Sequence, residues 1–205
     1  MQTRAPHVYT VYVSTREKIL AAARKAFDRK GLEGLSLREV AAKVGITPMA
    51  IYRHFASKEA LIDALVLDAL DEWSARVQAL PAVAGLAKIE QMGEAFLDFA
   101  LREPRRFEAA FLLPSRKARR YPDDFAAGRS PAGNIQLSVL EEGIRQGAVA
   151  AAPPVEIVLI NSALSQGLVT LYRAGRIAGG EEEFRALYRR AMRRVFRSFL
   201  LEKLK

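Results

Sequence analysis

The chain holds few of the residue types on which enzymes most often depend. Its 205 residues include no cysteine and two histidines, His7 and His54. This composition excludes disulfides, iron–sulfur clusters and thiol catalysis, and it leaves few ligands for a metal site. The adjacent carboxylates at 123–124 and 141–142 point to different sides of a helix or loop, which fits a solvated surface. The sequence therefore predicts a protein that is not an enzyme and that has no metal or cofactor.

The chemistry that the chain does favour is the binding of a polyanion, because its positive charge is concentrated. The formal net charge is +9 at pH 7. Residues 1–60 hold 11 Lys and Arg against five Asp and Glu, and residues 184–205 hold eight against one, whereas the middle of the chain is net acidic. A basic segment of this kind can neutralise phosphates and release their counterions, which drives binding to nucleic acid.

The stretch at 36–58, SLREVAAKVGITPMAIYRHFASK, has the spacing of two short helices joined by a tight turn. Ser36 and Glu39 have the spacing of a capping box, in which each side chain satisfies a backbone amide at the helix start. Gly45 follows the apolar face of this helix, where the chain needs a residue that tolerates a left-handed conformation. The Thr-Pro pair that comes next favours the start of a second helix of about two turns. A further cap at Ser57 is expected to open the next helix.

Small and apolar residues in this stretch predict how its two helices cross. Ala41 is small where the helices meet, Gly45 follows four residues later, and Ile51 is placed to face their shared core. Two helices joined by a turn of three or four residues form a helix-turn-helix, whose second helix enters the major groove of DNA. The same residues also fit an ordinary helical hairpin in a bundle. The caps, the spacing and the basic context together favour DNA binding.

Caps and helix breakers elsewhere predict an all-α fold of about nine helices. The first helix is expected at about 14–30, opened by a serine–glutamate capping box and ended by a glycine. Further helices are expected after the helix-turn-helix at about 58–80, 83–102, 105–113, 134–146, 155–174 and from 181 onwards. Residues 1–57 then form an arm and a DNA-binding head of three helices. Residues 58–205 form a helical ligand-binding and dimerisation body.

Over residues 26–65 the chain resembles the tetracycline-repressor (TetR) family of prokaryotic regulators. The resemblance rests on AFDRKGLEGLSLREVAAKVGITPMAIYRHFASKEALIDAL, and above all on IYRHFASKE at 51–59 followed by Leu61. It implies a cytoplasmic homodimer that places two helix-turn-helix heads in successive major grooves of a double-stranded DNA operator. It further implies a transcriptional repressor that a small-molecule ligand releases from the operator. A helical adaptor that binds protein partners without specific DNA binding is the alternative.

The resemblance also implies which side chains meet DNA. They are Ser36, Arg38, Thr47, Pro48, Met49, Ala50, Tyr52, Arg53, His54 and Lys58. Arg38 can donate two hydrogen bonds to a guanine edge, while Met49 and Ala50 offer only apolar contact, for example to a thymine methyl. The hydroxyl, imidazole and ammonium groups of the set can hold phosphates, and Arg53 suits either role. For Tyr52 the alternative is a core aromatic with a solvated hydroxyl.

The last two expected helices favour a homodimer interface. The helix at about 155–174 is apolar nearly all round, so it must be covered on more than one side. The helix that follows it has a strong apolar stripe, and two copies of this pair would form a four-helix interface. Ser162, Ala163 and Gly167 are small enough to allow close approach of paired helices.

Aromatic residues in the body favour a cavity for a small apolar or amphipathic ligand, with plain core packing as the alternative. The candidate lining residues are Trp73, Met92, Phe96, Phe99, Phe107 and Phe111, with Asn161 or Gln166 as polar fixtures. The segment at 99–113, FALREPRRFEAAFLL, resembles the TetR subgroup that has a Trp-His-Gly signature. The stretch at 162–168, SALSQGL, keeps only the glycine of that signature.

Two runs of basic residues have both a functional and a structural interpretation. The first is the loop expected at 114–131, and the second recurs every four residues on the last helix: Arg116, Lys117, Arg119 and Arg120, then Arg185, Arg189, Arg193 and Arg197. An anion site or a nucleic-acid contact is one interpretation, and a solvated surface is the one we favour. Since charged or polar residues interrupt the apolar stretches within a dozen positions, we expect no membrane span, and the first 13 residues lack the features of a signal peptide.

Overall fold

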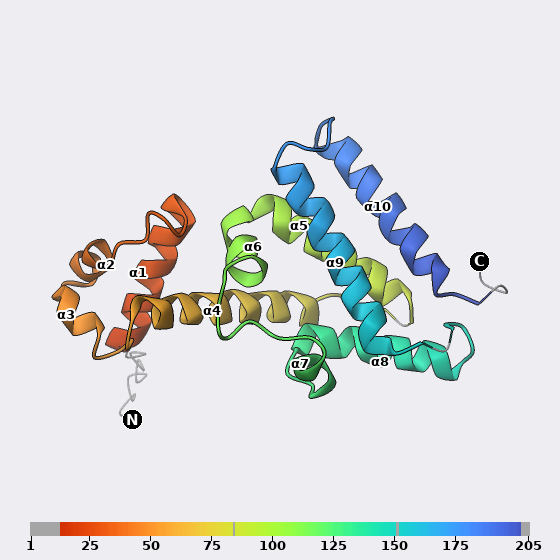
Figure 1. Ribbon diagram of the computed structural model, residues 1–205, viewed down its shortest axis with the longest axis horizontal. Helices are drawn as coiled ribbons and strands as arrows, with labels where there is room; N and C mark the ends of the chain where they lie inside the picture. The colour runs from red at the N-terminus through yellow and green to blue at the C-terminus, as the bar shows by residue number, and fades with distance from the viewer. Residues whose placement is uncertain (1–12, 84, 151, 202–205) are drawn as a thin grey trace, which may run out of the picture. The chain divides into compact units, whose positions relative to one another are not determined.

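The computed structural model describes residues 13–83, 85–150 and 152–201 (Figure 1). Over these ranges the chain forms ten helices and no β-strand, apart from one isolated bridge between Val149 and Leu200. The all-α fold class is confirmed. The helix beyond the expected nine is α7 (Asp123–Ala126), a single turn inside the segment predicted to be a loop. The predicted arm lies outside the described residues except for Val13, and so does His7.

The chain divides into two compact units, Met1–Leu65 and Val66–Lys205, which we call the head and the body. The boundary between them falls inside α4 (Lys58–Gln78). The boundary predicted from the sequence lies eight residues earlier, where this helix begins.

The head is built on α1 (Thr15–Lys30), α2 (Leu37–Val44) and α3 (Pro48–Ile51). The predicted capping box opens α1, since the Ser14 hydroxyl accepts from the Glu17 amide at 3.2 Å and the Glu17 carboxylate accepts from the Ser14 amide at 2.7 Å. α1 packs against α2, and α2 against α3. The buried side chains that hold these helices together are Ile19, Ala23, Phe27, Leu35, Val40, Ala41, Ile51 and Phe55.

Gly45 makes the turn between α2 and α3 as predicted. Its φ of 76° and ψ of 33° lie in the left-handed region, which residues with a Cβ rarely enter. The amides of Gly45 and Ile46 donate to the carbonyls of Ala42 and Ala41 at 3.3 and 3.1 Å, which satisfies the last carbonyls of α2.

Two local predictions for the head are wrong. Ser36 precedes α2 without a side-chain cap bond, because the Glu39 carboxylate accepts instead from Arg29 and from Lys30, the latter at 2.8 Å. Two cations at the end of α1 offer charge-assisted hydrogen bonds, which are stronger than a bond to a neutral amide. The second helix was expected to have two turns, but α3 has four residues and tighter turns continue the chain to Phe55.

The body contains the second half of α4 and six further helices. They are α5 (Ala87–Arg102), α6 (Pro104–Phe111), α7, α8 (Pro131–Arg145), α9 (Pro154–Arg173) and α10 (Glu181–Ser198). α5 contacts α6, α8 and α9, and α9 also contacts α8 and α10. In the view of Figure 1, α9 crosses α5 and runs beside α10, and α8 lies near the N-terminal end of α9. The helix bounds agree with the predicted ones within four residues.

A cluster of five aromatic rings joins α4, α5 and α6. Its members are Trp73, Phe96, Phe99, Phe107 and Phe111, with ring centroids 5.1 to 6.5 Å apart. Most of the ring pairs are edge-to-face or tilted, which is the arrangement that the ring quadrupoles favour. Phe99 and Phe107 are fully buried in this cluster, whereas Trp73 and Phe111 also border a cavity of about 370 Å³.

Three residues of the arginine stripe of α10, Arg189, Arg193 and Arg197, are exposed to solvent as favoured, whereas Arg185 is buried, and the stripe also makes ion pairs with α5. Arg185 pairs with Asp98 at 2.8 Å, Arg189 binds Glu94 through two hydrogen bonds, and Arg193 lies 3.7 Å from Glu90. The carboxylates recur every four residues on α5, as the arginines do on α10. The two helices therefore present matched rows of opposite charge, and three of the four arginines bridge them.

α9 also departs from expectation. Of the described helices it is the one that is long and apolar enough to cross a membrane, by length and composition only. We expected every apolar stretch to be too short, but the charged residues of α9, Glu156 and Arg173, lie near its ends, so the stretch between them meets this criterion. Only 28% of its most apolar window is buried, so α9 has an apolar face that the rest of the described chain leaves uncovered.

Candidate nucleic-acid interface and body cavity

The residues predicted to meet DNA all lie in the head with side chains that reach solvent. Eight are exposed and two, Ala50 and Lys58, are partly buried; the exposed ones are Ser36, Arg38, Thr47, Pro48, Met49, Tyr52, Arg53 and His54. Ile51 and Phe55, which alternate with them, are buried in the core of the head. α3 and the turn after it therefore have an inner apolar side, with Ile51 and Phe55, and an outer side that holds the predicted residues at 47–50 and 52–54.

The large side chains on this outer side are unusually exposed for their type. Met49 is 74% exposed and Tyr52 is 45% exposed. The alternative of Tyr52 as a core aromatic is therefore wrong. Apolar and aromatic side chains held in solvent next to basic ones are typical of a surface that a partner covers.

Local capping positions two of the predicted phosphate contacts. The Thr47 hydroxyl accepts from the Ala50 amide at 3.3 Å, so it caps α3 and keeps its own O–H free to donate. The Ser57 hydroxyl accepts from the Ala60 amide at 3.2 Å, which confirms the predicted cap. Lys58 is the first residue of α4, where the helix dipole adds to its ammonium charge in attracting an anion.

Two guanidinium groups of the predicted DNA-contacting set carry unpaired positive charge. Among the described residues, Arg38 and Arg53 have no ion-pair partner, whereas Arg29 and Lys30 are neutralised by Glu39. The hydrogen bond from Lys30, followed by the nearby charges, holds the pKa of Glu39 below its usual value. Within the predicted DNA-contacting set, Arg38 and Arg53 therefore offer unpaired guanidinium groups to an incoming polyanion.

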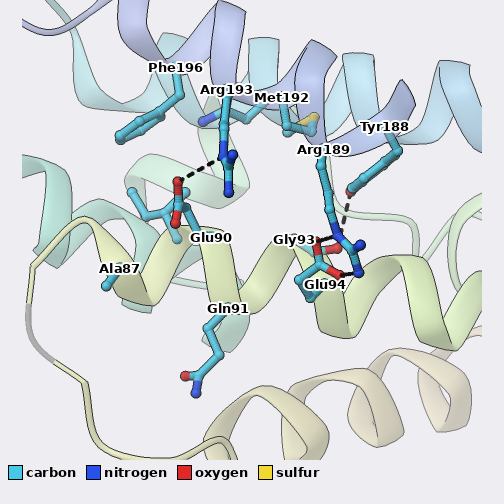
Figure 2. A pocket seen from close by; sticks show the side chains of 12 residues that line it. Ala87, Glu90, Gln91, Gly93, Glu94, Tyr188, Arg189, Met192, Arg193 and Phe196 are labelled. Atoms are coloured by element: carbon cyan, nitrogen blue, oxygen red, sulfur yellow. Dashed lines mark hydrogen bonds and ion pairs between the residues drawn. The ribbon is translucent and has the colours of Figure 1, made fainter. Parts of the chain in front are cut away.

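In the body, a cavity of about 440 Å³ lies between α5 and α10 (Figure 2). Its walls include Ile89, Asn161, Tyr188, Met192 and Phe196, and its edge carries the Arg189–Glu94 and Arg193–Glu90 pairs. Figure 2 shows these two arginines directed from α10 toward the carboxylates of α5.

The predicted ligand-binding residues surround a neighbouring cavity of only about 70 Å³. Six of the eight border it: Trp73, Met92, Phe96, Phe111, Asn161 and Gln166. Phe99 and Phe107 are fully buried in the ring cluster and border neither of these two cavities. The two cavities share four wall residues, among them Asn161 and Met192.

Sequence reasoning missed the contribution of α10 to the larger cavity. Tyr188, Met192 and Phe196 recur every four residues, so they share one face of α10. This spacing is a readable signal. The sequence analysis predicts a dimer interface for the apolar face of this helix, whereas the structure places part of that face in the cavity wall.

Tyr188 supplies a neutral polar wall. Its buried hydroxyl can donate to the Ser165 hydroxyl at 3.0 Å or to the Gly93 carbonyl at 3.2 Å. Burial raises the pKa of Tyr188 to about 12, so the phenol is uncharged at neutral pH.

Asn161 is the unusual polar group of the cavity. Its side chain is 4% exposed, and within the described part of the chain neither its Nδ2 nor its Oδ1 has a hydrogen-bond partner. Buried amides are almost always hydrogen-bonded, so this one needs an explanation.

Metal binding has no support in the described ranges. Over residues 13–83, 85–150 and 152–201 there is no group of three or more His, Cys, Asp or Glu that could hold a metal ion. The carboxylates that line the larger cavity are paired with arginines instead.

Comparison with known proteins accounts for both units. A family described as "Bacterial regulatory proteins, tetR family" matches residues 19–65. A second, described as "Tetracyclin repressor-like, C-terminal domain", matches residues 89–195, which is just over half of the chain. The chain belongs to the tetR family. The TetR resemblance of the head is thereby confirmed, and it extends to the body.

Individual relatives of this TetR-family chain are regulators by name. The transcriptional regulator UidR of Escherichia coli is 34% identical over 83 residues, which cover 40% of this chain and 41% of UidR. The transcriptional repressor KstR2 of Mycolicibacterium smegmatis is 27% identical over 160 residues, covering 75% of this chain and 77% of KstR2. The match to UidR thus spans about two fifths of that protein's length.

Solved structures share the fold of this TetR-family chain. A protein of unknown function from Rhodococcus superposes with a TM-score of 0.73 at 22% identity, covering 94% of this chain and 99% of that one. A TetR-family regulator from Pectobacterium atrosepticum superposes with a TM-score of 0.68 at 25% identity, covering 92% and 95%. The alternative of a helical adaptor without specific DNA binding is not favoured by this family membership.

Proposed function

We propose that this chain is a sequence-specific DNA-binding transcriptional regulator, a repressor that a small-molecule ligand releases from its operator. Regulators of the tetR family bind DNA operators as dimers and respond to small molecules. The observation that carries the proposal is the outer side of the helix-turn-helix, where Met49, Tyr52 and Arg53 lie in solvent while Ile51 and Phe55 fill the core. We further propose that the protein is cytoplasmic and has no catalytic activity.

The exposed set divides by chemistry into base contacts and phosphate contacts. Arg38 and Arg53 can reach guanine edges through two hydrogen bonds each, while Met49 and Ala50 give apolar contact. The phosphate contacts and positioning residues are Ser36, Thr47, Pro48, Tyr52, His54 and Lys58. Because the side chains of Met49 and Ala50 cannot donate hydrogen bonds, the two arginines and the shape of the DNA determine most of the sequence preference.

Dimerisation through α9 and α10 is the second part of the proposal. Leu159, Ile160 and Leu171 of α9 are 40–43% exposed in the single chain. A Cβ added at Gly167 would meet no atom within 4 Å, so the helix surface there is open. A second copy that packs α9 and α10 against the same helices would cover this apolar face and close a four-helix interface.

The ligand site is the third part. The two cavities that share Asn161 are the proposed site, with Trp73, Met92, Phe96, Phe111 and Gln166 around the smaller one. Phe99 and Phe107 support these walls from the ring cluster. A ligand that binds more tightly to the DNA-free state shifts the population toward it, which releases the operator.

A gel-shift experiment tests the DNA-binding part. Purified protein is mixed with the DNA upstream of its own gene and with random DNA of equal length, at 50 and 200 mM salt. The proposal expects a discrete complex with the upstream DNA at low salt that competing random DNA does not displace. Affinity should fall steeply at the higher salt, because phosphate contacts release counterions. Failure to form a sequence-specific complex at low salt would contradict the proposal.

A further inference from the structure

We propose that the larger cavity binds a neutral, mainly apolar molecule whose polar head presents a hydrogen-bond acceptor and a donor side by side, as an amide or lactam does. Asn161 would receive this head. The inference rests on the proposed ligand-responsive function and adds to it the chemical class of the ligand.

Asn161 is the anchor because its hydrogen-bonding capacity is unused. The residue is only 4% exposed, and no described residue bonds to its Nδ2 or Oδ1. An amide buried in this way destabilises the folded chain, whereas apolar groups of the same shape would not. A bound head that accepts from Nδ2 and donates to Oδ1 would satisfy both atoms at once.

The size and walls of the cavity fit an apolar ligand body. Its volume of about 440 Å³ lies within the usual range for small-molecule sites. Ile89, Met192 and Phe196 line it with aliphatic, thioether and aromatic surface. Asn161 also borders the smaller cavity, so it lies where the two spaces adjoin.

The charges at the cavity argue for a neutral ligand. Arg189 donates to both carboxylate oxygens of Glu94 at 2.8 and 2.7 Å, and Arg193 lies 3.7 Å from Glu90 (Figure 2). Each charge therefore has its counter-charge on the facing helix. A charged ligand would lose its hydration without gaining an unpaired opposite charge.

Tyr188 does not compete with Asn161 for the ligand head. Its hydroxyl is already positioned to donate to the Ser165 hydroxyl or to the Gly93 carbonyl. The Ser165 hydroxyl lies 3.4 Å from the Met192 sulfur. These polar groups satisfy one another, which leaves the Asn161 amide as the unsatisfied group in this part of the wall.

Four probes with the same apolar tail and different heads test the inference. They are octanamide, methyl octanoate, octanoate and octylamine, titrated into the purified full-length protein and followed by calorimetry or by NMR shifts. Octanamide has a donor and an acceptor, the ester has no donor, and the other two are charged at neutral pH. We expect octanamide to bind about tenfold or more tightly than each of the others, since only it satisfies both amide atoms without burying a charge.

Two variants locate the effect. Asn161→Leu removes the anchor at nearly constant volume, so it should bring octanamide and methyl octanoate within about threefold of each other and raise Tm by about 2–4 °C. Gln78→Leu replaces an exposed amide on α4 that borders neither cavity, and it should leave the tenfold preference unchanged.

Equal binding of the four probes by the wild-type protein, or preference for a charged probe, would overturn the inference even if the leucine variant does not fold. Preference for octanamide that survives in Asn161→Leu would overturn it as well. A gel shift with the upstream DNA on the same wild-type sample separates this from the proposed function. If the protein binds the upstream DNA specifically but does not discriminate among the probes, only the proposed ligand class is rejected. If it does not bind the upstream DNA specifically, the proposed regulator function is rejected.

Discussion

Arg106 of α6 donates from its Nε to the Oε2 of Glu72 on α4 at 2.9 Å, in a site where the arginine is 4% exposed. Its Nη2 also bonds to Asp68 at 2.8 Å, one helical turn earlier on α4. Glu72 in turn accepts from Arg76, which reaches Glu103 at the start of α6. These charges join α4 to α6 beside the aromatic cluster.

Removing the centre of this network should destabilise the body. Arg106→Met leaves two carboxylates without their buried partner, so we expect a loss of about 2–3 kcal/mol in the free energy of unfolding, measured by urea titration. The loss is below that of a fully buried pair because both carboxylates are partly exposed. Arg105→Met is the matched control, because Arg105 pairs with Glu108 on the helix surface, and it should cost under about 1 kcal/mol. If both variants lost the same free energy of unfolding, burial would not be what makes the ion pairs of Arg106 stronger than that of Arg105.

Gly167 should report the dimer interface. In the single chain a side chain at this position meets open space, so Gly167→Leu should leave the monomer folded. If a second copy of α9 packs there, the leucine forces the helices apart, and we expect the dimer Kd to rise at least about 100-fold. Sedimentation equilibrium measures this change. Ala75→Leu, an exposed small residue on α4, is the control that should leave dimer mass unaltered. A dimer of unchanged affinity in Gly167→Leu would exclude this face.

The two kinds of DNA contact should separate in a pair of alanine variants. Arg38→Ala should weaken operator binding by about 1–3 kcal/mol and relax the preference at one base pair, because it removes a two-bond base contact. Lys58→Ala should weaken operator and random DNA alike and lower the salt slope by about 1, because it removes a phosphate contact. Binding curves for both DNAs at several salt concentrations give these quantities. If each variant lost the same affinity for operator DNA as for random DNA, the assignment of a base contact to Arg38 and a phosphate contact to Lys58 would be wrong.

Glu39 should add an acid-sensitive contribution to the stability of the head. Its pKa is lowered in the folded chain, chiefly by the hydrogen bond from Lys30. Its contribution is therefore fully present above the pKa of an unfolded glutamate, ~4.3, and is lost as pH falls through the lower folded value. Urea unfolding between pH 3 and 7 should show that Glu39→Gln has a smaller loss of stability toward acid than the wild type. Glu33→Gln, an exposed change in the same head, is the control. Identical acid profiles for Glu39→Gln and the wild type would contradict this assignment.

The head was the most predictable part because its determinants are local. Gly45 takes the left-handed conformation expected from its place after an apolar helix face, and Ser14 and Glu17 form the expected cap. Such features depend on residues three to five positions apart, whose geometry the backbone itself imposes. The cap at Ser36 was mispredicted when a longer-range partner entered, since Arg29 and Lys30 lie nine or ten residues from Glu39.

In the body, the contacts between helices could not be predicted from local sequence patterns. The pairing of Arg189 with Glu94 joins residues 95 positions apart, and so does the contact of Tyr188 with Gly93. Periodicity showed that α10 has an apolar stripe and an arginine stripe. It could not show which helix faces each stripe, because several packings bury a similar apolar area.

The sequence by itself determined the all-α class and the helix-turn-helix, because capping, helix period and turn chemistry act over a few residues, and the family resemblance indicated the residues that the outer side exposes. Tertiary structure alone decided that five aromatic rings pack together, that α5 and α10 match acid to base, and that Asn161 is buried without a partner beside a cavity. These features depend on which side chains meet across helices. The free energies of these side-chain contacts come from packing and desolvation in the folded protein, and they cannot be inferred from the order of residues along the chain.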